Sequence, residues 1–332
     1  MRKVRWGVLG VAHINKKVIP GMQRGECCEI AAIASRDLAK AQRAAAEFGI
    51  PKAYGSYEEL LADGEIEAIY NPLPNHLHVP WSLRCAAAGK HVLCEKPLSL
   101  HAAEARQLLE AQARTGVKIG EAFMVRTHPQ WLRARELVRS GRIGELRACM
   151  GFFSYFNRDP ANIRNLPATG GGGLLDIGCY PITTSRFVFG EEPRRVMALV
   201  ERDPDMGTDR LASALLDYPS GQAIFTCSTQ LAPYQSMQFF GAKGRVEIEI
   251  PFNAPPDRGC RLFIDDGTDL FGASAETMEF PVCDQYAIQG DAFSRAVRGE
   301  CEVPVPVEDG VRNMAVIDAL FRSGESGRWE TP

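Results

Sequence analysis

The first third of the chain alternates short apolar runs with amphipathic stretches, and this alternation constrains the fold more than any other feature. Apolar runs of this length are typical of buried strands, and the stretches between them have the periodicity of helices. Strands that alternate with helices form parallel sheets, so this region is predicted to be an α/β domain. The predicted strands cover residues 4–9, 29–34, 68–70, 91–94 and 118–121.

After residue 121 the pattern changes to strands separated by short turns, which is typical of an antiparallel sheet. We therefore expect two domains, residues 1–122 and residues 123–332, because a chain of 332 residues suits two cores better than one. The second domain is expected to be α+β with a large, mostly antiparallel open sheet. Its expected strands cover residues 146–155, 194–201, 211–216, 222–230, 235–240 and 245–250.

The composition argues against several classes of partner. Charged residues make up 24% of the chain with a net charge of −3, so no basic surface for nucleic acid is expected. No apolar run reaches the roughly 18 residues of a membrane span, and no signal-peptide core follows the N-terminus. The ten cysteines include no C-x-x-C pair and the six histidines no H-E-x-x-H pair. We therefore expect no metal site and a reducing, cytoplasmic setting.

The passage from the first predicted strand into a helix contains Gly7 and Gly10. At such a turn the pyrophosphate of a dinucleotide meets backbone N–H groups and the helix dipole. Ala12 and Asn15 occupy the second and third glycine positions of G-x-G-x-x-G, so the motif alone fits an ordinary tight turn equally well. Its place between a strand and a helix favours a Rossmann dinucleotide-binding domain.

The residues after the second predicted strand indicate which dinucleotide is bound. An NAD site usually has an acid there, against the ribose 2′-hydroxyl. Here Ser35 and Arg36 follow the strand and Lys40 comes one helical turn later, which suits the 2′-phosphate of NADP. Asp37 is better placed as a helix N-cap, although it keeps NAD as the less favoured alternative. In the other interpretation Arg36 and Lys40 are solvated surface charges.

Polar residues also follow the later strands, at the edge where ligands bind to parallel sheets. Lys96 lies between Glu95 and Pro97. A lysine after a strand is usually a surface residue, but the proline restricts Lys96 and directs its ammonium group. We also expect the Lys96–Pro97 bond to be cis, because the chain has to turn sharply at the strand edge.

A glycine run at residues 170–173 precedes Asp176 and Tyr180. These two residues are four apart and share one face of a helix, and the glycines let a ligand approach the backbone closely. A buried tyrosine bonded to a neighbouring carboxylate explains the pair structurally. Functionally, a tyrosine near a fixed ammonium group can act as an acid or base, since the positive charge lowers its pKa.

Three motifs together resemble the glucose–fructose oxidoreductase / inositol dehydrogenase (Gfo/Idh/MocA) family. They are residues 94–97 (C-E-K-P), residues 74–78 (P-N-H-L-H) and the glycine run that leads to Asp176 and Tyr180. Residues 50–60 are most similar to the branch that contains dimeric dihydrodiol dehydrogenase and NADP-dependent D-xylose 1-dehydrogenase. The resemblance spans essentially the whole chain, and E-K-P is its most specific element.

The resemblance implies a Rossmann domain followed by an α/β domain with a large open sheet. It implies Lys96 and Tyr180 as the catalytic pair, with Asp176 on the substrate side. Thr183 and Thr184 follow Tyr180 where many relatives carry a carboxylate, which weakens the case for an inositol-type substrate.

Two further residues are assigned to the cofactor by the resemblance. Arg164 matches an arginine that reaches the cofactor, with Ile163 in place of the tryptophan of the family. Tyr286 matches an aromatic residue near the nicotinamide. The residues expected to contact NADP are Gly10, Ala12, His13, Ile14, Ser35, Arg36, Lys40, Pro72, Leu73, Asn75, His78, Glu95, Lys96, Arg164 and Tyr286.

We expect an oxidoreductase that moves hydride between NADP and an aldose, oxidised at its anomeric carbon, or a cyclic alcohol such as a trans-dihydrodiol. Two other functions fit: a sugar–sugar oxidoreductase that does not release its NADP, and a nucleotide-dependent binding or regulatory protein without turnover. Residues 222–230 alternate without a strongly charged face, so a homodimer or larger homo-oligomer built on this sheet is expected. The residues expected to bind the small-molecule substrate are Lys96, Arg126, Asp176 and Tyr180.

Overall fold

The computed structural model describes residues 2–332, which form two compact units. The first comprises residues 2–127 and 284–311, and the second comprises residues 128–283 and 312–332. The sequence pattern led us to place everything after residue 122 in the second domain. It contained no signal for the return of residues 284–311 to the first unit.

The first unit contains a six-stranded parallel sheet with the strand order β3-β2-β1-β4-β5-β6. The predicted α/β class is therefore confirmed for this unit, although the short strand β3 was not predicted. The strand order reverses between β1 and β4, and ligands bind open parallel sheets at such a point, beyond the carboxyl ends of the strands. The strands are β1 (Val4–Leu9), β2 (Cys28–Ala34), β3 (Lys52–Tyr54), β4 (Ala68–Asn71), β5 (His91–Cys94) and β6 (Ile119–Glu121).

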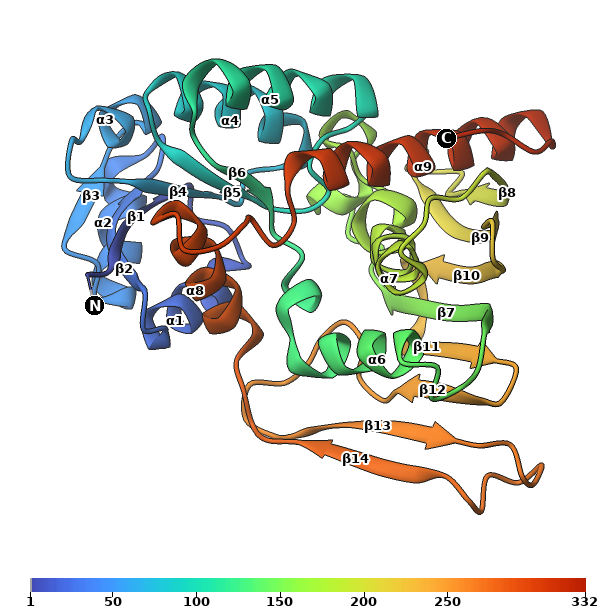
Figure 1. Ribbon diagram of the computed structural model, residues 1–332. Coiled ribbons are helices and arrows are strands. Elements are labelled where there is room, and N and C mark those ends of the chain that lie inside the picture. Colours follow the sequence, from blue (N-terminus) through green and yellow to red (C-terminus); the bar gives the residue numbers. More distant parts are fainter. Residues whose placement is uncertain (1) are drawn as a thin grey trace. The chain divides into compact units, whose positions relative to one another are not determined.

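Helices cover both faces of this sheet, with α4 and α5 over one face and α1 and α8 over the other (Figure 1). Local sequence determines several helix ends. The Asp37 carboxylate caps α2 by accepting a hydrogen bond from the backbone of Lys40, and Gly49 ends that helix in the left-handed conformation. The helices and short turns are α1 (Asn15–Arg24), α2 (Leu38–Phe48), α3 (Tyr57–Ala62), η1 (Asn75–Leu77), α4 (His78–Ala87), α5 (Ala102–Thr115), η2 (Met124–Thr127) and α8 (Gln285–Val297).

The returning segment is held in the first unit by a buried contact. The indole Nε1 of Trp6, on β1, donates a hydrogen bond to Ser294 Oγ, on α8, at 3.1 Å. The Trp6 ring also lies 5.5 Å from the ring of Phe293. The hydrogen bond joins residues 288 positions apart, so local periodicity predicts a helix here but does not assign it to a unit.

The second unit is built on an eight-stranded sheet with the order β14-β13-β12-β11-β7-β10-β9-β8. Neighbouring strands are antiparallel except β7 and β10, so the predicted mostly antiparallel sheet is confirmed. β13 and β14 were not predicted, because polar and turn-forming residues surround these short strands. The strands are β7 (Leu146–Phe156), β8 (Arg195–Arg202), β9 (Asp209–Asp217), β10 (Gln222–Ser228), β11 (Gln230–Gly241), β12 (Gly244–Ile248), β13 (Cys260–Asp265) and β14 (Glu276–Phe280).

Helices pack on one face of this sheet. α6 contacts β12 and β13, with Trp131 of α6 against Phe239 in the core, and α7 contacts β7. On the other face Leu199, Ile224 and Met150 remain 80%, 47% and 40% exposed. The helices and short turns are α6 (Pro129–Arg139), η3 (Ile163–Asn165), η4 (Pro167–Thr169), the π turn η5 (Leu174–Gly178), α7 (Cys179–Phe189) and α9 (Val307–Ser326), the last beginning in the first unit.

Candidate active site

The turn after β1 forms a backbone cradle. Gly10 has a φ of +80°, in the region that favours glycine. A Cβ atom at this position would lie 3.0 Å from a methyl group of Leu73, so a side chain would fill the cradle. Such an open turn before a helix N-terminus suits the pyrophosphate of a dinucleotide. The other predicted cofactor residues of this turn are Ala12, His13 and Ile14, which lead directly into α1.

The residues after β2 place two cations at the surface. Arg36 and Lys40 are exposed, and Ser35 is buried with its Oγ accepting the backbone N–H of Asp37. The Asp37 carboxylate accepts the backbone N–H of Lys40 at 3.2 Å, as predicted for a helix cap. The acid is therefore engaged in capping α2, while both cations are exposed to an anionic ligand.

His78 ties together the loops that follow β4 and β5. It is buried, with Nδ1 2.7 Å from the carbonyl oxygen of Pro97 and Nε2 2.6 Å from that of Leu73. The N–H of Leu73 also donates to Asn71 Oδ1. Because both ring nitrogens of His78 contact the backbone, its contribution to a cofactor site is to position these loops. The predicted residues Pro72 and Asn75 lie between β4 and α4, in the loop that follows β4.

Lys96 lies half-buried in the loop after β5, and its bond to Pro97 is cis, as predicted. Glu95 accepts hydrogen bonds from the hydroxyl of Tyr70 at 2.6 Å and from the backbone N–H of Lys96 at 3.3 Å. Burial and then the charge of Glu95 raise the pKa of Tyr286 well above its usual value, so this phenol keeps its proton. Tyr70 and Glu95 thus hold the loop that carries Lys96, and Tyr286 lies within electrostatic reach of Glu95.

Glu121, the last residue of β6, and Arg126, in the turn η2 after it, are both engaged within the first unit. Glu121 Oε1 accepts the N–H of Leu98 at 2.8 Å and so braces the loop that carries Lys96. Arg126 forms a 2.7 Å ion pair with Asp309, and both side chains are largely buried. Breaking a buried pair leaves an uncompensated charge, so this guanidinium is held by the protein.

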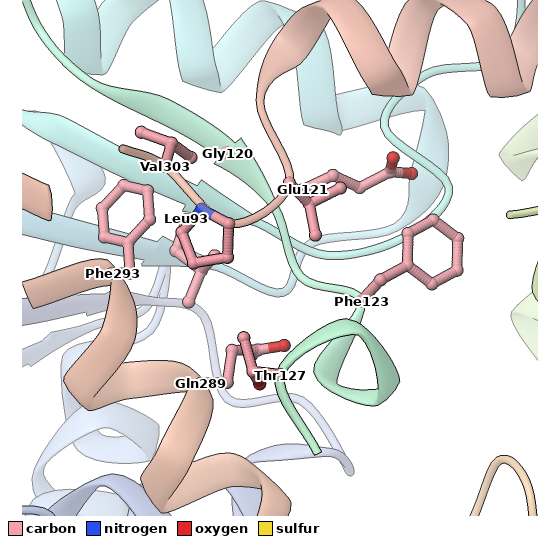
Figure 2. A pocket seen from close by; sticks show the side chains of 10 residues that line it. Leu93, Gly120, Glu121, Phe123, Thr127, Gln289, Phe293 and Val303 are labelled. Carbon is pink, nitrogen blue, oxygen red and sulfur yellow. The ribbon is translucent and has the colours of Figure 1, made fainter. Parts of the chain in front are cut away.

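A small pocket lies beside β6 (Figure 2). Figure 2 shows the apolar side chains Leu93, Phe293 and Val303 in its wall, with Gln289 from α8. Among the described residues, the side-chain oxygen of Gln289 has no hydrogen-bond partner. The wall is mostly apolar, with Glu121, Thr127 and Gln289 as its polar residues, so we regard this pocket as a packing space of the first unit.

In the second unit, two of the candidate site residues follow the glycine run at residues 170–173. Gly172 has a φ of +124°, and a Cβ atom there would lie 1.9 Å from Asp209 Oδ1. Asp209 Oδ2 accepts the N–H of Leu174 at 2.6 Å. Burial raises the pKa of Asp209 to about 7, against the opposing effect of the backbone donors. This buried carboxylate at the start of β9 anchors the beginning of the π turn η5.

Asp176 lies in the π turn at the centre of a polar cluster. Its Oδ2 accepts hydrogen bonds from the Tyr155 hydroxyl at 2.7 Å and from Arg164 Nε at 3.1 Å. Burial and then the charge of Asp176 raise the pKa of Tyr155 well above its usual value, so the phenol remains the donor. Single π turns within helices occur frequently at functional sites. The predicted residues Arg164 and Asp176 are therefore direct partners.

Tyr180 lies in the first turn of α7 and is 6% exposed. Its ring centroid is 5.6 Å from that of Phe153 and 5.4 Å from that of Phe252. Arg164 lies within electrostatic reach of the phenol. The tyrosine is thus fixed by aromatic packing, with the guanidinium of Arg164 as its charged neighbour.

The structure brings the predicted residues together in two groups. Arg164, Asp176 and Tyr180 lie in the second unit, and all the other predicted residues lie in the first. Three supporting residues, Tyr70, Tyr155 and Asp209, were not predicted. The aromatic run that ends β7 was a weak signal for Tyr155. Asp209 had no signal, because its partner Leu174 is 35 residues away in the sequence.

Two kinds of feature are absent from residues 2–332. No group of three or more His, Cys, Asp or Glu side chains is arranged to hold a metal ion. No helix in this part of the chain is long and apolar enough to cross a membrane.

Two family models match the sequence. The model described as "Oxidoreductase family, NAD-binding Rossmann fold" matches residues 4–123. The model described as "GFO/IDH/MocA C-terminal domain" matches residues 131–247. Each match falls on one of the two groups of candidate residues, and only Arg126 and Tyr286 lie outside both matched ranges.

Individual relatives match over nearly the whole chain. An uncharacterized oxidoreductase of Rhizobium meliloti is 49% identical over 100% of both chains. D-xylose 1-dehydrogenase (NADP(+)) 2 of Haloferax volcanii is 40% identical over 97% of this chain and 98% of its own. The crystal structure of KijD10, a 3-ketoreductase from Actinomadura kijaniata in complex with NADP and TDP-benzene, has a TM-score of 0.89 at 30% identity, covering 97% of this chain and 98% of its own.

Proposed function

Because this chain belongs to the Gfo/Idh/MocA family of oxidoreductases, we propose that it is an NADP-dependent dehydrogenase of an aldose or a cyclic polyol. The observation that carries the proposal is the polar cluster of the second unit. There a buried carboxylate, Asp176, accepts hydrogen bonds from the phenol of Tyr155 and the guanidinium of Arg164, and Arg164 lies within electrostatic reach of Tyr180. Such a set can hold several hydroxyl groups while one of them loses its proton.

The first unit supports the choice of NADP. The Gly10 cradle has room for a pyrophosphate, and Arg36 and Lys40 are exposed beside it in sequence position for a 2′-phosphate. Asp37, the acid that an NAD site would use, is engaged as the cap of α2. The Haloferax volcanii relative is named as an NADP enzyme, which agrees with this choice.

In the proposed mechanism Tyr180 accepts the proton of the substrate hydroxyl. Lys96 stabilises the negative charge that develops on oxygen, and the Tyr70–Glu95 pair holds the loop on which Lys96 lies. Bound NADP would supply the hydride acceptor. Asp176 and Arg126 bind further hydroxyls of the substrate, Arg164 reaches the cofactor and bonds to Asp176, and Asp209 keeps the π turn in place.

An aldose that is oxidised at its anomeric carbon to a lactone is the first substrate class, and a cyclic trans-dihydrodiol is the second. Carboxylate and guanidinium groups together offer acceptors and donors to neighbouring hydroxyls, which a sugar ring presents in larger number than a dihydrodiol. The Haloferax volcanii relative is named for D-xylose, so pentoses are the first compounds to assay.

We also propose that the chain forms a homodimer or larger homo-oligomer through the open face of the eight-stranded sheet. Ile224 on β10 is the cross-strand neighbour of Met150 on β7 and of Leu215 on β9. Cross-strand neighbours share one face of a sheet, so these side chains form an apolar row on the face opposite α6 and α7. An exposed apolar row of this kind is typical of an association surface.

The test of the function is a screen of aldoses, inositols and trans-dihydrodiols for formation of NADPH, followed by absorbance. Turnover of an aldose with release of NADPH is expected. If NADP stays bound through purification and is reduced by one sugar and reoxidised by another, the enzyme is a sugar–sugar oxidoreductase. Binding of NADP without turnover of any compound would contradict the proposal and favour a regulatory or binding protein.

A further inference from the structure

Tyr57, at the start of α3, is a buried tyrosine whose hydroxyl has no hydrogen-bond partner among the described residues. Its side chain is 7% exposed. Only two influences act on its pKa, burial, which raises it, and the charge of Arg36, which lowers it. The hydroxyl oxygen is not among the buried polar atoms without a partner, so the oxygen reaches the surface although the ring is buried. The hydroxyl is therefore accessible to a hydrogen-bond partner that is not part of the protein.

The Tyr57 hydroxyl lies over the turn after β1. A Cβ atom on Gly10 would lie 3.3 Å from the Tyr57 oxygen on one side and 3.0 Å from a Leu73 methyl group on the other. The phenol thus forms part of the wall of the Gly10 cradle. It comes from α3, an element to which sequence reasoning assigned no role in binding.

Packing holds the phenol in this place. The ring of Tyr57 meets the ring of Trp81, on α4, edge to face with 4.7 Å between the centroids. The guanidinium of Arg84 lies over the Trp81 ring, 4.5 Å from its centroid, and pairs with Glu58. A side chain fixed by such contacts loses little entropy when it binds a ligand.

The charge of Arg36 restricts what the partner can be. A guanidinium has only donors and no acceptor, so it cannot accept the hydrogen of the Tyr57 hydroxyl. An oxyanion can accept hydrogen bonds from a phenol and from a neighbouring guanidinium at the same time. Phosphate oxygens accept such charge-assisted hydrogen bonds strongly. The ligand chemistry at this point is that of a phosphate group.

We propose that Tyr57 is a specificity residue for the cofactor: its hydroxyl donates a hydrogen bond to the 2′-phosphate of the adenosine ribose, beside Arg36. The inference rests on the NADP preference proposed above and adds a residue to it. NAD lacks this phosphate, so the bond is made to NADP alone.

The experiment measures binding directly, by isothermal titration of the purified full chain with NADP and with NAD. Tyr57→Phe keeps the ring and its contact with Trp81 and removes only the oxygen. Its affinity for NADP is expected to fall about tenfold or more, as for the loss of a hydrogen bond to a charged group, and its affinity for NAD to stay within about twofold. The matched control is Tyr54→Phe, which removes a phenol hydroxyl bonded to Asp63 on the same unit and is expected to leave the NADP-to-NAD ratio unchanged.

Arg36→Ala, measured in parallel, separates this inference from the cofactor proposal. If Arg36→Ala lowers the affinity for NADP alone and Tyr57→Phe changes neither affinity, Tyr57 has no part in recognition while the NADP preference stands. If neither variant alters the ratio, the NADP preference itself is wrong. An equal loss of NADP and NAD in Tyr57→Phe, or a lowered melting temperature without ligand, would overturn the assignment, since the hydroxyl would then serve both cofactors or the fold.

Discussion

At the scale of single residues, Tyr180 shows how its surroundings separate two interpretations of one side chain. Phe153 and Phe252 pack against its ring, which a structural tyrosine also requires. Its neighbour Asp176, however, is bonded to Tyr155 and Arg164. Two partners other than Tyr180 thus hold the carboxylate, and we propose the chemical role for Tyr180.

We predict that Tyr180→Phe and Lys96→Ala each reduce turnover by about 10²–10⁴-fold, the usual contribution of a general acid or base. Both variants should keep their melting temperature and their affinity for NADP, because the changes affect the chemical step. Steady-state kinetics with the substrate found by the screen, together with thermal unfolding, measure this. The control is Tyr218→Phe, which removes a buried hydroxyl bonded to Ser185 and should lower stability while turnover is kept. A Tyr180→Phe enzyme with full activity would contradict the mechanism and leave the fold and family untouched.

Cofactor choice is also decided by single side chains. Arg36→Ala is predicted to weaken NADP binding on the order of tenfold or more and to leave NAD binding almost unchanged, because only NADP carries the extra phosphate. Titration calorimetry with each cofactor gives both numbers. Arg43→Ala, which removes another exposed arginine of α2, is the matched control and should change neither affinity. Equal losses of affinity for both cofactors in Arg36→Ala would show that the arginine does not distinguish a 2′-phosphate from a 2′-hydroxyl.

At the scale of elements, the glycine run and β9 depend on each other through direct contact. Gly172 can lie against Asp209 only because it has no side chain, and Asp209 in turn holds the N–H of Leu174. The backbone of Gly172 also accepts the N–H of Asp176 at 3.0 Å. The start of the element that carries Asp176 and Tyr180 therefore depends on contact between a loop and a strand distant in sequence.

Gly172→Ala is predicted to destabilise the protein by clearly more than the roughly 1–2 kcal/mol that a left-handed alanine costs, because its methyl group would collide with Asp209. Turnover should fall as well, whereas NADP affinity should be largely kept, because all predicted cofactor residues except Arg164 lie in the other unit. Urea unfolding, kinetics and titration calorimetry test the three parts. Gly141→Ala is the control, since Gly141 has a φ of +77° with nothing within 4 Å of a Cβ atom. Equal destabilisation by the two substitutions would mean that the Asp209 side chain moves aside to make room for the methyl group and does not anchor the turn.

At the scale of the whole molecule, the open sheet face determines the expected assembly. Ile224→Lys places a charge in the middle of the apolar row and is predicted to convert the oligomer to a monomer at micromolar concentration, because a buried unpaired charge opposes association. Sedimentation velocity of the wild type and the variant measures this. Leu270→Lys, which changes a fully exposed leucine between β13 and β14, should leave the assembly unchanged. A wild-type chain that sediments as a monomer would remove the basis of the prediction.

Several features could be predicted because they depend on residues close together in the chain. The alternation of apolar runs predicts the parallel sheet, since each strand and its following helix bury their own faces. Asp37 caps α2 through a contact three residues away, and the E-K-P and glycine motifs identify Lys96, Asp176 and Tyr180 by local order alone. For the same reason the family could be recognised from the sequence.

Contacts between distant segments could not be predicted in this way. The return of residues 284–311 depends on the bond between Trp6 and Ser294, and the anchoring of Leu174 depends on Asp209. The partners of Asp176 come from a strand and a loop, and the hydroxyl of Tyr57 reaches the Gly10 turn from another helix. The sequence by itself determined most of the elements, the family and the candidate chemical groups. Only the tertiary structure decided which buried polar groups meet, because their partners are chosen by packing in space and not by spacing along the chain.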